Sequence, residues 1–311
     1  MFPLRFGAVL SHQATSWPAF RDAALAAEAA GFDSIWTWDH LLASDGPPDQ
    51  PVLEGWMLLA ALAPITTRPT LGLMVAANTF RSPALTAKIV TTLDHLSDGR
   101  AILGIGAGWL EREHDAFGID FDGSMGERLD RMDEAIVLIR RLLDGERFDH
   151  EGRFYRFHDA WLSPRPIQAH LPILIGGSGP KKTLRTLARH ADMWNEGGDL
   201  ATMLAHDAIL RERCAEVGRD PETIERTLYC HVVLRDDPAE ARQVHEVAIR
   251  AHGMDPAGED WGPFLGSSEA VAADLGPYVK AGFSHLTMVF DEPYDLETIG
   301  RAPELRALLE A

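Results

Sequence analysis

GFDSIWTWDH, residues 31–40, contains the unit on which the whole fold is built. Gly31 follows a helical stretch that Ser16 can cap, and glycine just past a helix end is a common stop signal. The apolar run Ser34–Trp38 comes next, as expected for a strand buried in a parallel sheet. The stretch therefore predicts a helix, a turn, and a strand that delivers Asp39 and His40 at its carboxyl end.

The same alternation of apolar run and helical pattern recurs along the chain. After Ser82-Pro83, apolar residues at i, i+4 and i+8 spacing predict another helix, and Ser268 can cap a helix that ends near Ala281. Eight parallel strands alternating with helices indicate an α/β fold, a (β/α)₈ TIM barrel. The eight predicted strands are Leu4–Leu10, Ser34–Trp38, Leu71–Ala76, Ala101–Ile105, Pro172–Ile175, Met193–Trp194, Thr227–Leu234 and His285–Phe290.

The chain has no internal repeat and no Gly/Ser linker, so we expect residues 1–311 to form one domain. Residues 118–170 are too many for a simple loop, and we expect an insertion on the barrel rim there. It would hold a helix over Arg128–Leu143 and a small strand in the alternating run 153–157. The rival doubly wound sheet needs a glycine-rich fingerprint after the first strand, and residues 6–13 lack it.

The composition excludes several classes of function. A net charge of −18 disfavours binding to nucleic acid or to anionic membranes. The first residues lack the pattern of a signal peptide, and no apolar run approaches the roughly 20 residues that cross a bilayer. Cys214 and Cys230 form neither a disulfide framework nor a metal motif. We therefore expect a cytoplasmic protein without a metal site. The sequence also lacks the Gly-x-Ser-x-Gly nucleophile elbow that would predict a hydrolase.

Active sites of such barrels gather at the carboxyl ends of the strands. The pair Asp39-His40 can orient an imidazole for proton transfer, or Asp39 can simply cap a turn. Gly176–Gly179, followed by Lys181 and a helix, can hold a phosphate or form an ordinary tight turn. The alternating glycines of 104–108 permit close approach by a ring or by another backbone.

Taken together, these residues resemble the luciferase-like monooxygenase superfamily, and within it the branch that uses the deazaflavin coenzyme F420. The resemblance extends over nearly the whole chain. Its motifs are the stretches 31–40, 80–88 (FRSPALTAK), 92–100 (TLDHLSDGR), 104–109 (GIGAGW), 164–166 (PRP), 172–179 (PILIGGSG) and 188–195 (ARHADMWN).

The resemblance implies a role for each candidate residue. Asp39 would contact the deazaflavin and His40 would lie at its reacting edge as the proton-handling group. A backbone bulge at Met74 and Val75, often with a non-prolyl cis peptide bond, would stand behind the ring, near Asn78. Gly106, Ala107 and Gly108 would line the ring, while Gly176, Gly177 and Ser178 would bind the phosphate, with Lys181 or Lys182 near the acidic tail. A homodimer is also a family expectation.

Trp109 departs from the pattern, because the sugar-phosphate dehydrogenases of this branch have a proton-transferring Glu there. The resemblance therefore implies another small organic substrate, in a pocket formed by His12, Trp17, Trp38, Trp109 and His231. Glu111, Glu113 and His114 are predicted to form a solvated face. We expect hydride transfer to or from F420. The alternatives are an FMN-dependent monooxygenase that uses dioxygen and a flavin-binding barrel without catalysis.

Overall fold

The eight predicted strands form a closed parallel barrel in the computed structural model, which describes residues 2–121, 123–253 and 262–311. Each strand pairs with the next around the barrel, and the last pairs with the first. This confirms the α/β TIM-barrel prediction. In barrel order the strands are β1 (Arg5–Leu10), β2 (Ser34–Thr37), β3 (Thr70–Leu73), β5 (Ala101–Gly106), β8 (Ile173–Gly176), β9 (Met193–Glu196), β10 (Glu225–Leu234) and β12 (His285–Phe290).

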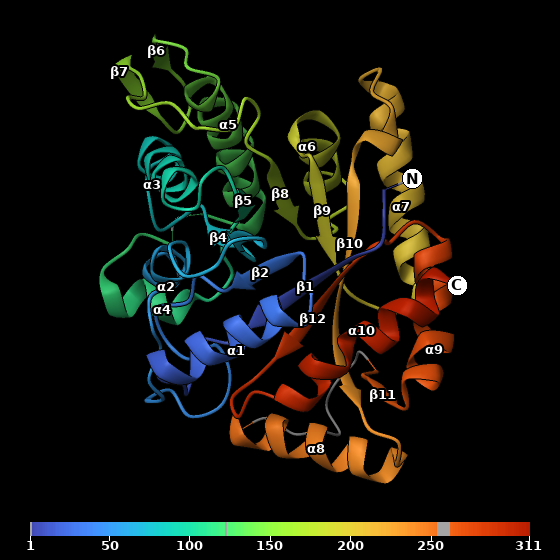
Figure 1. Cartoon of the computed structure of the whole chain (residues 1–311). Coiled ribbons are helices and arrows are strands. Elements are labelled where there is room, and N and C mark those ends of the chain that lie inside the picture. Colours follow the sequence, from blue (N-terminus) through green and yellow to red (C-terminus); the bar gives the residue numbers. More distant parts are fainter. Residues whose placement is uncertain (1, 122, 254–261) are drawn as a thin grey trace.

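Helices surround the barrel (Figure 1). The predicted helix caps at Ser16 and Ser82 are confirmed, because their side chains accept hydrogen bonds from the backbone amides of Ala19 and Leu85. The cap of α9 is Ser267, one residue before the predicted Ser268. The helices are α1 (Trp17–Ala29), α2 (Gly55–Leu62), α3 (Pro83–Leu96), α4 (Glu111–Phe117), α5 (Met125–Leu143), α6 (Thr183–His190), α7 (Leu200–Glu216), α8 (Pro238–Ala251), α9 (Ser268–Lys280) and α10 (Leu296–Glu310), with a 3₁₀ turn, η1 (Pro221–Thr223). Within the described ranges, no helix has both the length and the apolar composition to span a bilayer.

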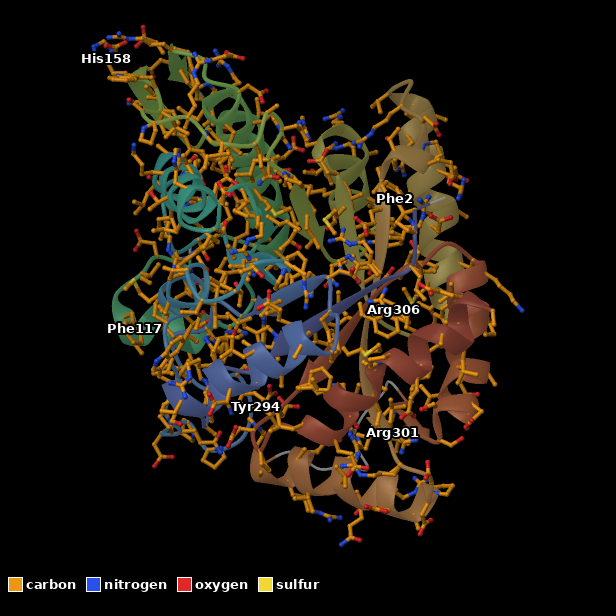
Figure 2. The ribbon with its side chains drawn as sticks, viewed as in Figure 1. Phe2, Phe117, His158, Tyr294, Arg301 and Arg306 are labelled. Atoms are coloured by element: carbon orange, nitrogen blue, oxygen red, sulfur yellow. The ribbon has the colours of Figure 1, made fainter. Side chains whose placement is uncertain are left out.

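The connection over residues 118–170 contains α5 and a hairpin. A capping box between Ser124 and Glu127 starts α5, which packs against α3 and α6 and so covers the barrel between β5 and β8. Strands β6 (Phe148–Glu151) and β7 (Arg156–Ala160) form a separate antiparallel pair that extends away from the barrel (Figure 1). His158 lies at its outer edge (Figure 2), with its side chain 96% exposed.

The third barrel position holds two short strands instead of the predicted continuous run Leu71–Ala76. Strand β3 and the two-residue β4 (Ala76–Ala77) both pair with β5, and the Met74–Val75 peptide bond between them is cis. A Cβ at Gly104 would lie 1.9 Å from the Leu73 carbonyl oxygen. Gly104 therefore allows another backbone segment to approach closely. This was one of the two interpretations given for the alternating glycines of 104–108.

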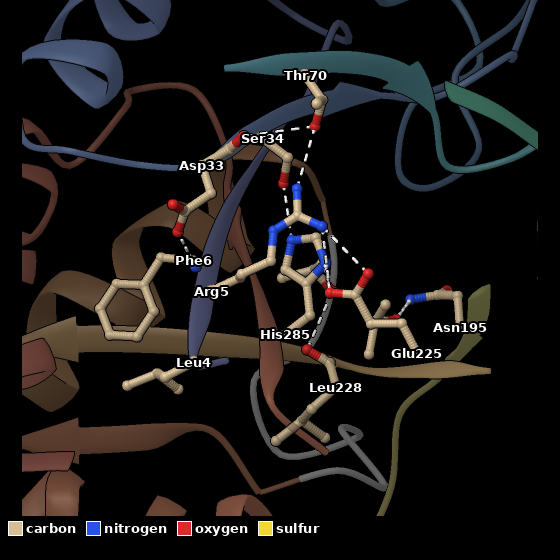
Figure 3. A network of polar contacts seen from close by, with 12 residues as sticks. Leu4, Arg5, Phe6, Asp33, Ser34, Thr70, Asn195, Glu225, Leu228 and His285 are labelled. Atoms are coloured by element: carbon tan, nitrogen blue, oxygen red, sulfur yellow. Dashed lines mark hydrogen bonds and ion pairs between the residues drawn. The ribbon is translucent and has the colours of Figure 1, made fainter. Parts of the chain in front are cut away.

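A polar network closes the barrel at the amino ends of its strands (Figure 3). Arg5 donates to both carboxylate oxygens of Glu225 at 3.2 and 3.1 Å. His285 lies 3.2 Å from Glu225 and 2.8 Å from the Ser34 hydroxyl. Burial opposes ionisation of Glu225, but His285 and Arg5 outweigh it and lower the pKa of the carboxyl. The network joins β1, β2, β10 and β12 at the end opposite the site described below.

We expect Glu225→Gln to lower the free energy of unfolding by about 2 kcal/mol, because charged hydrogen bonds to Arg5 become neutral ones in a buried place. Urea denaturation at pH 7 would measure the change. Catalysis at the other end of the barrel is expected to be unaffected. A stability equal to that of the wild type would show that the network contributes no net stability.

Candidate active site

Two adjoining cavities open at the carboxyl ends of the barrel strands. The larger has a volume of about 420 Å³ and the smaller about 130 Å³, together within the range of small-molecule sites. Both are lined by Trp38, His40, Met74 and Trp109. The site predicted from the ends of β2, β3 and β5 is therefore a real hollow, and His40 stands where its two parts meet.

His40 is held by a buried carboxylate. Its Nδ1 lies 3.1 Å from Oε1 of Glu113, and the other oxygen of Glu113 accepts from the Leu41 amide at 2.9 Å. The Glu113 side chain is only 3% exposed, against 17% for His40. The Trp109 ring meets the imidazole edge to face, with centroids 5.5 Å apart. A carboxylate on Nδ1 fixes the proton there and leaves Nε2 as the nitrogen for a ligand.

Glu113 and His114 are buried, so the prediction that they form a solvated face was wrong. Glu113 is 2% exposed and His114 is fully buried, although Glu111 is exposed as predicted. His114 contacts Thr79 and the Leu110 carbonyl through its two ring nitrogens. Helix α4 therefore packs its Glu113–His114 side against the barrel end.

Asp39 is engaged with protein groups on both of its oxygens. Arg81 donates to them at 2.6 and 2.9 Å, and the Ala77 amide donates to Oδ2 at 2.9 Å. Burial raises the pKa of Asp39 to about 6, although Arg81 opposes the rise. Arg81 also reaches Glu54 at 3.0 Å. The carboxylate thus ties the end of β2 to β4, directly beside the cis peptide bond.

The smaller cavity is lined by several of the residues that were predicted to surround a ring. Its walls are the Met74–Val75 bulge on one side and Gly106 and Gly108 of the β5 end on another. A Cβ at Gly106 would lie 2.7 Å from Val75. Gly177, with φ of +103°, lets the β8 end turn sharply beside Ser178 in the larger cavity. This cradle of glycines before the start of α6 fits a planar ring with a phosphate.

Several predicted residues lie outside the lining of both cavities. Trp17 packs against the core from the first turn of α1, and Asn78 donates to the Tyr155 hydroxyl at 3.1 Å. Ala107 and Gly176 are also absent from the lining, and Lys181 is exposed on the surface. Lys182 is paired with Asp130 at 2.7 Å.

His12 is a special case, because it is fully buried behind Trp38. Burial first, and then the proximity of His40, lower its pKa to about 3, although the Leu53 backbone favours the charged form. The His12 imidazole is therefore neutral at ordinary pH. It supports the Trp38 wall from behind instead of lining the hollow.

The structure also brings in residues that the sequence analysis did not assign to the site. Besides Glu113 and Arg81, these are the lining residues Ser44, Asp45, Asn195, Glu196, Tyr229 and Asp291. Glu196 and Asp291 stand at or just after the carboxyl ends of β9 and β12, and that position alone could have suggested them. His231, predicted for the substrate pocket, lines the larger cavity.

Known proteins of similar sequence match most of the chain. The chain is 34% identical to an F420-dependent glucose-6-phosphate dehydrogenase of Kineococcus radiotolerans, covering 94% of this chain and 92% of that protein. It is 35% identical to an F420-dependent hydroxymycolic acid dehydrogenase of Mycobacterium tuberculosis, over 76% of this chain and 64% of that protein.

Solved structures agree on the fold. An F420-dependent secondary alcohol dehydrogenase, determined with an F420–acetone adduct, superposes with a TM-score of 0.85 at 18% identity and covers 99% of both chains. The monooxygenase RslO1 of Streptomyces bottropensis superposes with a TM-score of 0.79 at 23% identity, over 98% of both chains. The family model for luciferase-like monooxygenases matches residues 1–287. The chain therefore belongs to the luciferase-like monooxygenase family.

Proposed function

We propose that this protein is an F420-dependent oxidoreductase that transfers a hydride between the deazaflavin and a small organic substrate. The observation that carries the proposal is the His40–Glu113 pair at the junction of the two cavities. Relatives that match most of the chain are named as F420-dependent dehydrogenases, which supports F420 over FMN.

In this proposal, each side of the cavity has its own role. The Met74–Val75 bulge, Gly106 and Gly108 hold the ring, and Gly177 and Ser178 bind the phosphate. Asp39 is a positioning residue that keeps the bulge in place through the Ala77 amide. When bound, the deazaflavin supplies a two-electron hydride acceptor or donor, and the protein orients the substrate toward it.

His40 handles the proton that accompanies the hydride. When an alcohol is oxidised, Nε2 of His40 would accept the hydroxyl proton, and the bound deazaflavin would be the acceptor for the hydride of the carbinol C–H bond. Glu113 keeps the Nδ1 proton in place and stabilises the imidazolium that results. Reduction of a carbonyl runs the same steps in reverse. Trp109 cannot accept or donate that proton, so we propose a substrate other than a sugar phosphate.

A titration of the apoprotein tests the choice of cofactor. We expect F420 to bind at least tenfold more tightly than FMN, as measured by the change in absorbance and fluorescence of each cofactor. Gly177→Val, which forces a branched side chain onto a positive φ, should weaken binding of both. Tight binding of FMN with no response to F420 would favour the monooxygenase alternative.

A further inference from the structure

The larger cavity has a wall that the cofactor residues do not account for. It is formed by the loop after β2, by the middle of β10 and by the residue after β12, and it carries Asp45, Tyr229 and Asp291. Burial first, and then the charges of Asp291 and Asp45, raise the pKa of the Tyr229 hydroxyl. The two carboxylates and this hydroxyl line the same cavity, so one bound molecule can meet all three.

No strong cation balances these acids among the described residues. The carboxylates that line the larger cavity are Asp45, Glu196 and Asp291, and its lining contains neither Lys nor Arg. Residues 1, 122 and 254–261, which lie outside the described ranges, also contain no Lys or Arg in their sequence. The described lining of the cavity therefore carries three carboxyl groups and no Lys or Arg.

Within the described ranges, the side chains of Asp45 and Asp291 make few hydrogen bonds to the protein. Asp291 lies 4.0 Å from both His231 and His252, beyond hydrogen-bond distance. Asp45 accepts from the neighbouring Ser44 hydroxyl at 2.8 Å. Each ionised acid is an acceptor only, so a ligand that brings hydrogen-bond donors suits these three positions.

Glu196 adds a second and independent indication. Its side chain is 6% exposed, and one oxygen lies 2.5 Å from His206 Nδ1. The other oxygen, Oε2, is buried, and the Ser178 hydroxyl is the one donor near it, at a geometry too poor for a regular hydrogen bond within the described ranges. Buried carboxylate oxygens rarely stay unsatisfied in native proteins, and a donor from a bound molecule would satisfy this one.

We propose that the substrate is an alcohol, or the matching carbonyl compound, that bears no negative charge and carries a further hydrogen-bond donor near the reacting carbon. This proposal rests on the function proposed above and deepens it. A phosphate or carboxylate group of the substrate would meet Asp45 and Asp291 on this wall, which belongs to other strands than the Gly177–Ser178 turn assigned to the cofactor phosphate. A hydroxyl or ammonium group finds acceptors there. The faces of Trp38 and Trp109 would pack against the carbon skeleton.

The first test measures the charge of the cavity without any turnover. Trp109 is 58% exposed in the cavity. Trp161, next to the distant hairpin, is 54% exposed, has Arg147 over its ring and serves as the reference outside the cavity. The fluorescence of each is isolated as the difference between wild type and the Trp109→Phe or Trp161→Phe variant. For each tryptophan, the quenching constant for caesium is divided by that for iodide. We expect this ratio to be at least threefold higher at Trp109 than at Trp161. Equal ratios would overturn the proposed negative cavity.

The Asp45→Asn/Asp291→Asn double variant assigns the effect to these acids. It should bring the quenching ratio of Trp109 close to that of Trp161, provided that its melting temperature stays near that of the wild type. A ratio that remains at the wild-type value would show that other charges set the potential.

The second test uses the F420-loaded enzyme at pH 8 with four matched secondary alcohols: propan-2-ol, propane-1,2-diol, 1-aminopropan-2-ol and lactate. We expect lactate to have a kcat/KM at least tenfold below that of the diol. The ratio of amino alcohol to diol then shows whether an ammonium or a hydroxyl is the preferred donor. Lactate turned over as well as the diol would refute the proposal. If none of the four alcohols reacts, the result argues against the proposed function. The quenching ratio then still tests whether the larger cavity is negatively charged.

Discussion

Replacing His40 with Ala lowers the rate of hydride transfer by about 100- to 10,000-fold, the usual contribution of a positioned acid or base, and leaves F420 binding nearly unchanged. The reason is the geometry of the pair: Glu113 is bound to Nδ1, so Nε2 is the one nitrogen of His40 that can exchange a proton with a substrate. Stopped-flow measurement of F420 absorbance gives the rate, and a titration gives the affinity.

Two further variants separate the roles of the pair. Glu113→Gln keeps the shape but removes the charge that stabilises the imidazolium, so its rate should fall less than that of His40→Ala and its pH–rate profile should shift. His158→Ala, at the exposed edge of the hairpin, is the control and should behave as wild type. A His40→Ala enzyme with wild-type rate would remove His40 from the chemistry. A wild-type protein that binds F420 but transfers no hydride would favour the non-catalytic barrel.

The barrel could be predicted from the sequence because its signals are local. Apolar runs such as Ser34–Trp38, caps such as Ser16 and stops such as Gly31 each act within one turn or one strand. The cap of α9 was misplaced by one residue because Ser267 and Ser268 stand side by side. Such ambiguity changes the end of an element but leaves the order of strands intact.

The positions of site residues at strand ends could also be predicted, but their partners could not. His40 and Glu113 are 73 residues apart, and Asp39 and Arg81 are 42 apart. In the sequence, Glu113 stands among charged residues that are typical of an exposed helix. Its burial depends on how α4 docks against the loop after β2, which no local pattern encodes.

The direction in which a side chain points was equally hidden from the sequence. Trp17, Trp38 and Trp109 are alike as aromatic candidates, yet Trp17 packs outward from the barrel mouth against the core. The acidic wall is likewise built from the loop after β2, from β10 and from the end of β12, which meet only in the folded chain. Composition gave a net charge of −18 for the whole protein without showing where the acids gather.

Replacing Arg81 with Met is expected to destabilise the protein by about 3–5 kcal/mol, because it leaves the Asp39 carboxylate buried without its counter-ion. The Asp39 side chain is 2% exposed and that of Arg81 is 13% exposed, so water cannot replace the lost guanidinium. The free energy of unfolding by urea at pH 7.5 measures the effect. Arg153→Met removes an ion pair from a side chain that is 61% exposed, and should cost less than about 1 kcal/mol.

The same variant has a pH dependence whose sign follows from burial. Burial already raises the pKa of Asp39 to about 6 in the presence of Arg81, and removal of Arg81 raises it further. A carboxyl whose folded-state pKa is above its unfolded value loses stability as the pH rises through the folded-state pKa. The stability gap between Arg81→Met and wild type should therefore widen between pH 6 and pH 8.

Adding Asp39→Asn to Arg81→Met tests whether the buried charge is the cause. The neutral amide can keep a hydrogen bond to the chain without carrying charge, so at least half of the lost stability should return and the added pH dependence should disappear. If the double variant is as unstable as Arg81→Met at every pH, the loss comes from the packing of the Arg81 side chain. In that case Asp39 positions the Met74–Val75 bulge through the Ala77 amide alone.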